Sequence, residues 1–96
     1  MDDIIGRIVY SKAGRDKDRM FIVIRAVNDR YVVVADGDLR KIEKPKFKNI
    51  KHLQLTNTKA EDVIMYLKKG EMPDNHLIRK TLKKIREARE QHGKGV

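Results

Sequence analysis

Short apolar segments separated by polar turns fill the first half of the chain. Three of them, at 7–10, 19–27 and 30–36, are rich in Val, Ile, Phe and Tyr, which favour a pleated, half-buried surface. The Asn28-Asp29 pair between the second and the third is typical of a tight hairpin turn, because both residue types tolerate a left-handed backbone. The pattern therefore predicts strands rather than helices here.

Two more strands are predicted after a turn at 36–37. The first covers 38–44, and Pro45 ends it or places it at an edge, because proline has no amide hydrogen to donate to a sheet. The second covers 49–55, where apolar and polar residues alternate. Five short strands with turns every eight to twelve residues or so predict a small β barrel or sandwich.

The pattern changes to a helical one after residue 56. Thr58 and Glu61 have the spacing of a capping box at a helix start, and Gly70 is a typical helix stop. A second helix is predicted to start near Asp74 or Asn75. Its apolar face consists of Leu77, Ile78, Leu82 and Ile85.

This second apolar face is narrow and has no aromatic anchor, so we expect it to pack against the barrel or a partner protein rather than a membrane. The chain is predicted to divide into a barrel at 1–56, a two-helix extension at 57–92 and a flexible tail at 93–96.

Composition points to an anionic partner. The 96 residues include 39% charged residues and carry a formal net charge of +9, which favours nucleic acid, an anionic membrane surface or an acidic protein. There is no cysteine, which excludes disulfides and thiolate metal sites. No apolar run approaches the roughly 18 residues that span a bilayer. The start of the chain is acidic, unlike a signal peptide. We expect a cytoplasmic protein.

The sequence does not indicate catalysis. His52, His76 and His92 lack the spacing of metal ligands, and no glycine-rich phosphate loop is present. Asp36 and Asp38 flank a glycine, which favours a turn over a catalytic carboxylate pair. We therefore expect a protein that is not an enzyme and that has no cofactor and no metal.

Basic residues gather in three segments: a loop after the first strand, the stretch 40–51 and the second helix. So many cations in 40–51 repel one another in a compact fold unless an anion relieves them. Polyphosphate does so by releasing counterions. The residues predicted to contact RNA phosphates in the first two segments are Lys12, Arg15, Lys17, Arg19, Arg40, Lys41, Lys44, Lys46 and Lys48.

Phe47 lies between two of these lysines. It either stacks on an RNA base, as aromatic residues do on single-stranded RNA, or plugs the end of the barrel, and the sequence leaves both open. His52 is expected to help close the barrel rather than read a base.

The stretch GRIVYSKAGRDKDRMFIVI resembles a KOW motif, in which an apolar strand leads into a loop with a glycine and basic residues and then into a second apolar strand. The resemblance continues through DRYVVVADGDLRKIEKPKFKNIKHLQLT, where residues 50–53 match an "I-x-H-L" final strand. The chain is thus similar to the small KOW-domain RNA-binding proteins of Gram-positive bacteria. These are in turn similar to the large-subunit ribosomal protein of the fourteen-e type from archaea and eukaryotes.

This resemblance implies a five-stranded SH3-like barrel that binds large-subunit ribosomal RNA, as a ribosome component or a translation accessory factor. Gly14 matches the motif glycine, and Arg15 and Lys17 match the basic loop. Asp18 stands where the family usually has a second glycine. Because aspartate tolerates a left-handed backbone better than most residues, we expect the turn to be kept.

Two other functions stay open at this stage. One is an SH3-like protein-interaction module within the transcription or translation machinery. The other is a ribosomal scaffold whose C-terminal helices dock on a neighbouring ribosomal protein.

Overall fold

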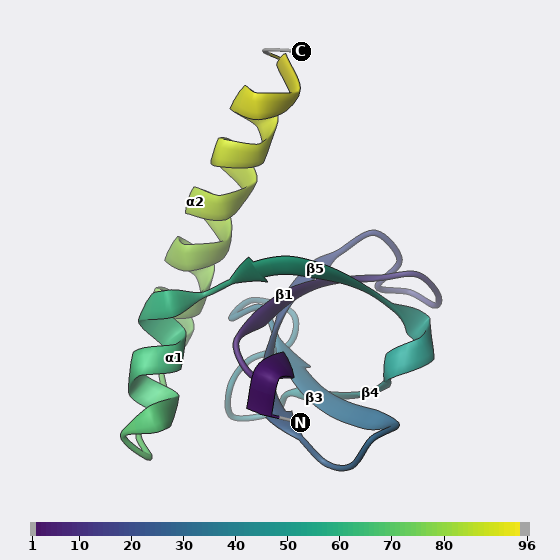
Figure 1. Cartoon of the computed structure of the whole chain (residues 1–96), viewed down its shortest axis with the longest axis vertical. Helices are drawn as coiled ribbons and strands as arrows, with labels where there is room; N and C mark the ends of the chain where they lie inside the picture. Colours follow the sequence, from purple (N-terminus) through teal and green to yellow (C-terminus); the bar gives the residue numbers. More distant parts are fainter. Residues whose placement is uncertain (1, 95–96) are drawn as a thin grey trace.

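The computed structural model describes residues 2–94, and the side-chain surroundings of residues 3–89. Its fold confirms the predicted class, mainly β with two helices at the C-terminal side (Figure 1). The elements in chain order are η1 (Asp2–Ile4), β1 (Arg7–Ser11), β2 (Met20–Ala26), β3 (Tyr31–Ala35), β4 (Lys46–Asn49), η2 (Ile50–His52), β5 (Leu53–Lys59), α1 (Glu61–Lys68) and α2 (Asn75–Lys94).

The five strands form one antiparallel sheet in the order β4-β3-β2-β1-β5. The sheet curls on itself, and the 3-10 turn η2 joins β4 and β5, the two strands at its opposite ends (Figure 1). This barrel-like arrangement is consistent with an SH3-like shape.

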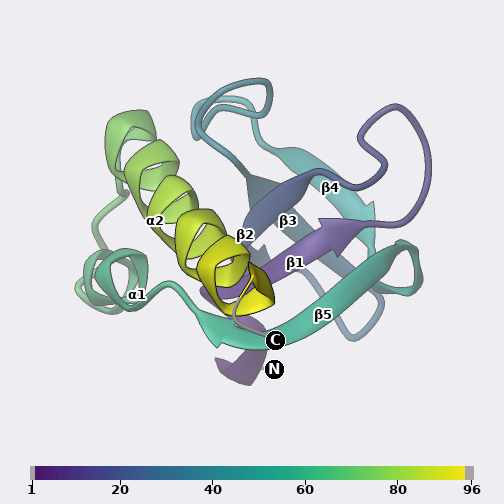
Figure 2. The same cartoon turned by 90° about the horizontal axis from the view of Figure 1, so that it is seen from above.

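Both faces of the sheet are buried, which explains its uninterrupted apolar runs. Phe21 and Val23 of β2 belong to a cluster that fills the inside of the curl, together with residues of β1, β3 and β5. Ile22 belongs to a second cluster, on the outside, which also contains Ile78 and Leu82 of α2. The helices cover this outer face (Figure 2). The second helix therefore packs against the barrel, as the sequence analysis allowed.

Gly37 lies in close contact with α2. Its φ is +76°, and a Cβ atom there would lie 2.5 Å from the backbone oxygen of Asn75, the first residue of α2. The Nη1 of Arg79 donates a hydrogen bond to the Gly37 carbonyl at 2.6 Å. Only glycine fits both this backbone conformation and this contact.

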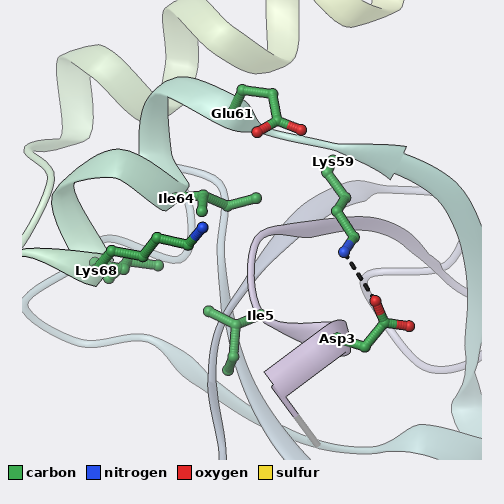
Figure 3. Close-up of a pocket in the computed structure, with 7 residues that line it drawn as sticks. Asp3, Ile5, Lys59, Glu61, Ile64 and Lys68 are labelled. Carbon is green, nitrogen blue, oxygen red and sulfur yellow. Dashed lines mark hydrogen bonds and ion pairs between the residues drawn. The ribbon is translucent and has the colours of Figure 1, made fainter.

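Helix α1 is attached to the other end of the barrel. The amide of Ala60 donates to the carbonyl of Gly6 at 2.7 Å, and Lys59 Nζ lies 2.9 Å from Asp3 Oδ1 (Figure 3). The Lys59 hydrogen bond lowers the pKa of Asp3 below its usual value. A groove of about 590 Å³ remains between η1 and α1, and its apolar residues are Ile5, Ile64 and Leu67.

The predicted strand at 38–44 is wrong. The amides of Asp36 and Gly37 both donate to the carbonyl of Arg40, at 2.9 and 3.2 Å, and this local pairing closes a turn. The strand forms later, as β4, directly after Pro45 and at the edge of the sheet, where proline is tolerated.

The predicted strand at 49–55 is also displaced. The Asn49 side chain accepts a hydrogen bond from the amide of Lys51 and so starts η2. The strand then begins at Leu53 and continues to Lys59. His52 is exposed on η2, and only its carbonyl contributes to closing the barrel, by accepting the amide of Lys12 at 2.8 Å. His52 therefore helps to close the barrel through its backbone.

The predicted capping box at Thr58 and Glu61 is also wrong. Thr58 lies within β5, and Ala60 precedes α1 without a side-chain cap, because its methyl group cannot accept a hydrogen bond. The helix ends at Lys68, before Gly70, as predicted. Helix α2 continues through Lys94, so residues 93 and 94 of the predicted tail are helical, while 95 and 96 lie outside the described residues.

The contact at Gly37 leads to a stability prediction with a matched control. Gly14 also has a positive φ, of +78°, but a Cβ there would meet nothing within 4 Å. We expect Gly14→Ala to lower the free energy of unfolding by about 1 kcal/mol and Gly37→Ala by about 2 to 4 kcal/mol, because the second also displaces α2. Urea unfolding monitored by circular dichroism measures both values. Equal losses would contradict the close approach at Gly37.

Candidate functional site

The loop between β1 and β2, which we call the first loop, spans residues 12–19. The amide of Ser11 donates to the carbonyl of Arg19 at 3.0 Å, and the amide of Asp18 donates back to Ser11 at 2.7 Å. Asp18 has a φ of +69°, a left-handed backbone that aspartate tolerates better than most residues. The expectation that the turn is kept with aspartate is confirmed.

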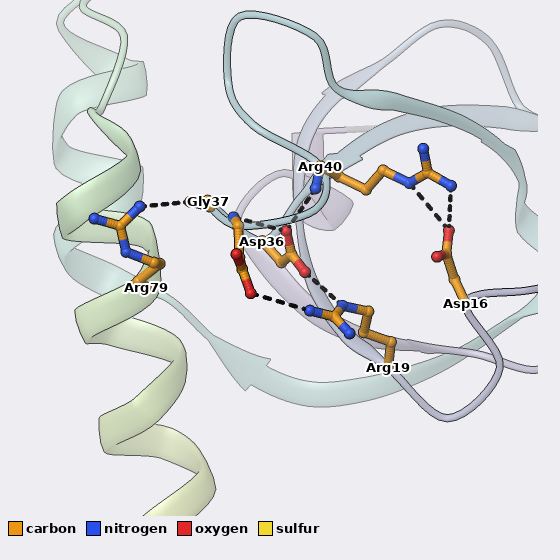
Figure 4. Close-up of polar contacts among 7 residues, drawn as sticks. Asp16, Arg19, Asp36, Gly37, Arg40 and Arg79 are labelled. Carbon is orange, nitrogen blue, oxygen red and sulfur yellow. Dashed lines mark hydrogen bonds and ion pairs between the residues drawn. The ribbon is translucent and has the colours of Figure 1, made fainter.

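Asp16 fixes the first loop to the barrel. Its side chain is 5% exposed, and its Oδ2 accepts hydrogen bonds from Nε and Nη2 of Arg40 at 3.2 and 3.0 Å (Figure 4). The residues on either side, Arg15 and Lys17, are exposed. The buried carboxylate therefore holds the loop in a shape that presents two cations to solvent.

Asp36 is a second buried carboxylate, close to the first (Figure 4). Its Oδ2 accepts a hydrogen bond from Arg19 Nε at 2.7 Å. Its Oδ1 accepts the amides of Asp38 and Arg40 at 3.0 and 2.8 Å. Burial raises the pKa of Asp36, but these hydrogen bonds outweigh it, and the pKa lies below its usual value. The expected role of Asp36 in a turn is confirmed.

Arg19 and Arg40 therefore help to hold the first loop and the turn after β3 in place. We call their ion pairs with Asp36 and Asp16 the frame. Arg19 also lies 3.3 Å from Asp38, and its hydrogen bond with Asp36 raises its pKa above the usual value. Arg40 is bound to Asp16. Sequence analysis treated both arginines as phosphate contacts and missed Asp16; the only signal was an acid within a basic loop. That these two arginines contact phosphate stays a prediction.

Seven of the predicted RNA-contacting cations form no ion pair with any residue that the structure describes at side-chain level. Two contacts bring their segments together: Arg40 with Asp16, and Lys48 Nζ with Ser11 Oγ at 3.3 Å. We call this set the basic surface: Lys12, Arg15, Lys17, Lys41, Lys44, Lys46 and Lys48.

Strand β4 divides its side chains between two faces. Lys46 and Lys48 pair with Val34 and Val32, so they share the face of the inner cluster, whereas Phe47 projects from the opposite face. Phe47 is 54% exposed. It does not plug the barrel, and that alternative is excluded.

The cations of α2 contribute to holding the helix on the barrel. Arg79 donates to Gly37, as described above, and the Arg89 guanidinium lies 5.6 Å from the centre of the Tyr10 ring. Arg89 Nη2 also donates to Thr58 Oγ1 at 3.2 Å. A groove of about 700 Å³ runs between this helix and the end of the first loop.

Within residues 3–89, whose side chains the structure describes, no three His, Asp or Glu side chains lie close enough together to bind a metal ion. Within residues 2–94, neither helix has the length and apolar character needed to cross a membrane. No protein-family model and no curated protein sequence matches this chain. The resemblance to KOW proteins therefore stays an expectation from the sequence.

The lowered pKa of Asp36 has a consequence for stability. Its contribution is complete above the unfolded pKa of about 4 and is lost as the pH falls through the lower, folded-state pKa, because the unfolded chain then binds a proton first. Asp36→Asn keeps an acceptor for the two amides but loses the ion pair with Arg19. We expect it to lower the free energy of unfolding by about 2 kcal/mol at neutral pH.

Urea unfolding at about pH 7, 4 and 3 tests this expectation, and the deficit of Asp36→Asn should shrink toward the lowest pH. The control is Asp38→Asn, whose side chain is 66% exposed and which should cost less than about 0.5 kcal/mol. A deficit that does not change with pH would contradict the assignment.

Proposed function

We propose that this protein is a non-catalytic RNA-binding protein of the cytoplasm, that large-subunit ribosomal RNA is its partner, and that the basic surface contacts the phosphates. The observation that carries the proposal is which cations are paired with acidic side chains and which are not. Arg19 and Arg40 neutralise the buried carboxylates, and the cations of the basic surface stay without an acidic partner on a loop and a strand that are held in place.

Few acids compete for these cations. Within the same segments, Glu43 accepts two hydrogen bonds from Asn75 Nδ2, at 2.7 and 3.0 Å, and Asp18 is exposed at the end of the first loop. The seven cations therefore repel one another across a small area. Binding a polyphosphate chain relieves that repulsion and releases counterions.

The fold supports the same proposal. A curled five-stranded sheet with η2 between its last two strands is consistent with the SH3-like barrel that the KOW resemblance implies. Gly14 and Asp18 both have left-handed backbones, as the two glycine positions of a KOW loop require. These features favour an RNA ligand, and the resemblance favours ribosomal RNA. Phosphate contacts position a protein without specifying a sequence, so the proposal names the class of RNA and not the site.

The proposal predicts the salt dependence of binding. The double variant Arg15→Ala/Lys17→Ala should bind large-subunit ribosomal RNA more weakly, and the slope of log affinity against log salt should fall by about 1.5 to 2, because two phosphate contacts are lost. Filter binding or fluorescence anisotropy over a range of salt concentrations measures both quantities.

The control removes the same charge from another surface. Lys68 and Lys69 are exposed at the end of α1, on the side of the barrel away from the first loop (Figures 1 and 2). Lys68→Ala/Lys69→Ala should leave the slope nearly unchanged. If both double variants change the slope equally, only net charge matters and the first loop is not the interface.

A protein-interaction module is the second candidate, and one observation favours it. Besides the apolar groove between η1 and α1, a second groove beside α1 is lined by Met65 and Tyr66, which are 58% and 42% exposed. Such a surface would suit a neighbouring ribosomal protein docking on the helices. A partner bound there would show little dependence on salt, and the Arg15→Ala/Lys17→Ala variant would bind it as the wild type does.

A further inference from the structure

Phe47 and Tyr31 form a stacked aromatic pair on the outer face of the barrel. Their ring centres are 4.8 Å apart, and the ring planes differ by 16°. Tyr31 is half-buried, whereas Phe47 is 54% exposed. One side of the Phe47 ring is therefore supported by Tyr31, and much of the remaining ring is accessible to solvent.

The sheet below makes this pair rigid. Phe47 pairs with Val33, which is 6% exposed, and Tyr31 pairs with Asn49. The backbone of the adjoining turn is fixed by the Asn28 side chain, which accepts the amides of Arg30 and Tyr31 at 2.8 and 2.9 Å. An aromatic ring held in this way loses little conformational entropy when a ligand stacks on it.

A cation, Arg25, belongs to the same line of paired residues across the sheet as Phe47. Arg25 pairs with Val33 on one side, and Val33 pairs with Phe47 on the other, so the side chains of Arg25 and Phe47 are on the same face, two strands or about 10 Å apart. Arg25 is exposed and forms no ion pair with a residue described at side-chain level.

Helices α1 and α2 cover a different part of the outer face. Figures 1 and 2 both place β4 on the side of the barrel away from α1. The outward aromatic ring thus shares its face with Arg25, whereas its chain neighbours Lys46 and Lys48 lie on the opposite face.

We propose that the Phe47–Tyr31 pair binds an unpaired RNA base by stacking on the exposed face of Phe47, with Arg25 on the adjacent phosphate. This inference rests on the proposed function and adds to it a single-stranded segment as the ligand. The surrounding charge decides the occupant: an exposed ring that shares its face with the exposed cation of Arg25 suits a base on a phosphate chain. Bases within a duplex are stacked on each other and cannot offer a free face.

The Phe47→Trp variant turns this site into a fluorescence probe, because the chain has no other tryptophan. A single-stranded RNA of about 12 nucleotides should quench its emission, and a fully paired duplex of the same length should quench it much less. Quenching by a proline-rich peptide instead of RNA would assign the surface to a protein partner and overturn the proposal.

Affinity measurements complete the test. Phe47→Leu should weaken binding of the single strand by about tenfold or more, with an unchanged salt slope because no charge is lost. Arg25→Ala should reduce that slope by about 0.7. Met65→Ala, which shortens another exposed apolar side chain, is the control and should bind as the wild type does. Circular dichroism of each variant checks that it folds.

The two proposals fail in different ways. If Phe47→Leu binds the single strand as tightly as the wild type, the stacking site is overturned while ribosomal RNA binding by the basic surface stands. If the wild type binds neither the single strand nor ribosomal RNA, the proposed function itself is wrong.

Discussion

Two buried carboxylates, Asp16 and Asp36, hold the first loop and the turn after β3 together. Each accepts an arginine that comes from a distant part of the chain, Arg40 and Arg19 respectively, and Asp36 also accepts two backbone amides of its own turn. Because a buried carboxylate is costly unless it is paired and hydrogen-bonded, these contacts determine how the first loop and the turn after β3 lie relative to each other. The same turn contains Gly37, on which α2 packs.

This arrangement separates two kinds of basic residue. Arginines are used within the frame, where a planar guanidinium can donate several directed hydrogen bonds to carboxylate and backbone carbonyl oxygens. Lysines predominate in the basic surface, where a flexible point charge suits contacts with phosphate. A surface of unpaired cations is tolerable in so small a fold because the frame below it satisfies its own charges. The proposed stacking site at Phe47 would add a directional contact to this otherwise non-directional attraction.

The apolar pattern was sufficient to predict the strands β1 to β3 and the face by which α2 packs on the barrel. The strand at 38–44 could not be predicted correctly, because Asp36 and Arg40, which close the turn by local hydrogen bonds, are held by ion pairs with Arg19 and Asp16, which are distant in sequence. The capping residue Thr58 was misassigned for a similar reason: the amide of Ala60 is satisfied by Gly6, at the start of the chain. Local patterns contain no information about such partners.

Local sequence patterns are equally insufficient to predict which residues of the basic segments are free to bind RNA. A cation count marks the segments that are basic, but it cannot tell Arg19, which binds a buried acid, from Arg15, which is exposed.

The most direct test of the central claim is crosslinking of the protein to RNA in cells, followed by sequencing of the bound RNA. The account predicts enrichment of large-subunit ribosomal RNA at a defined position. Recovery of no RNA above the level of an uncrosslinked sample would contradict it.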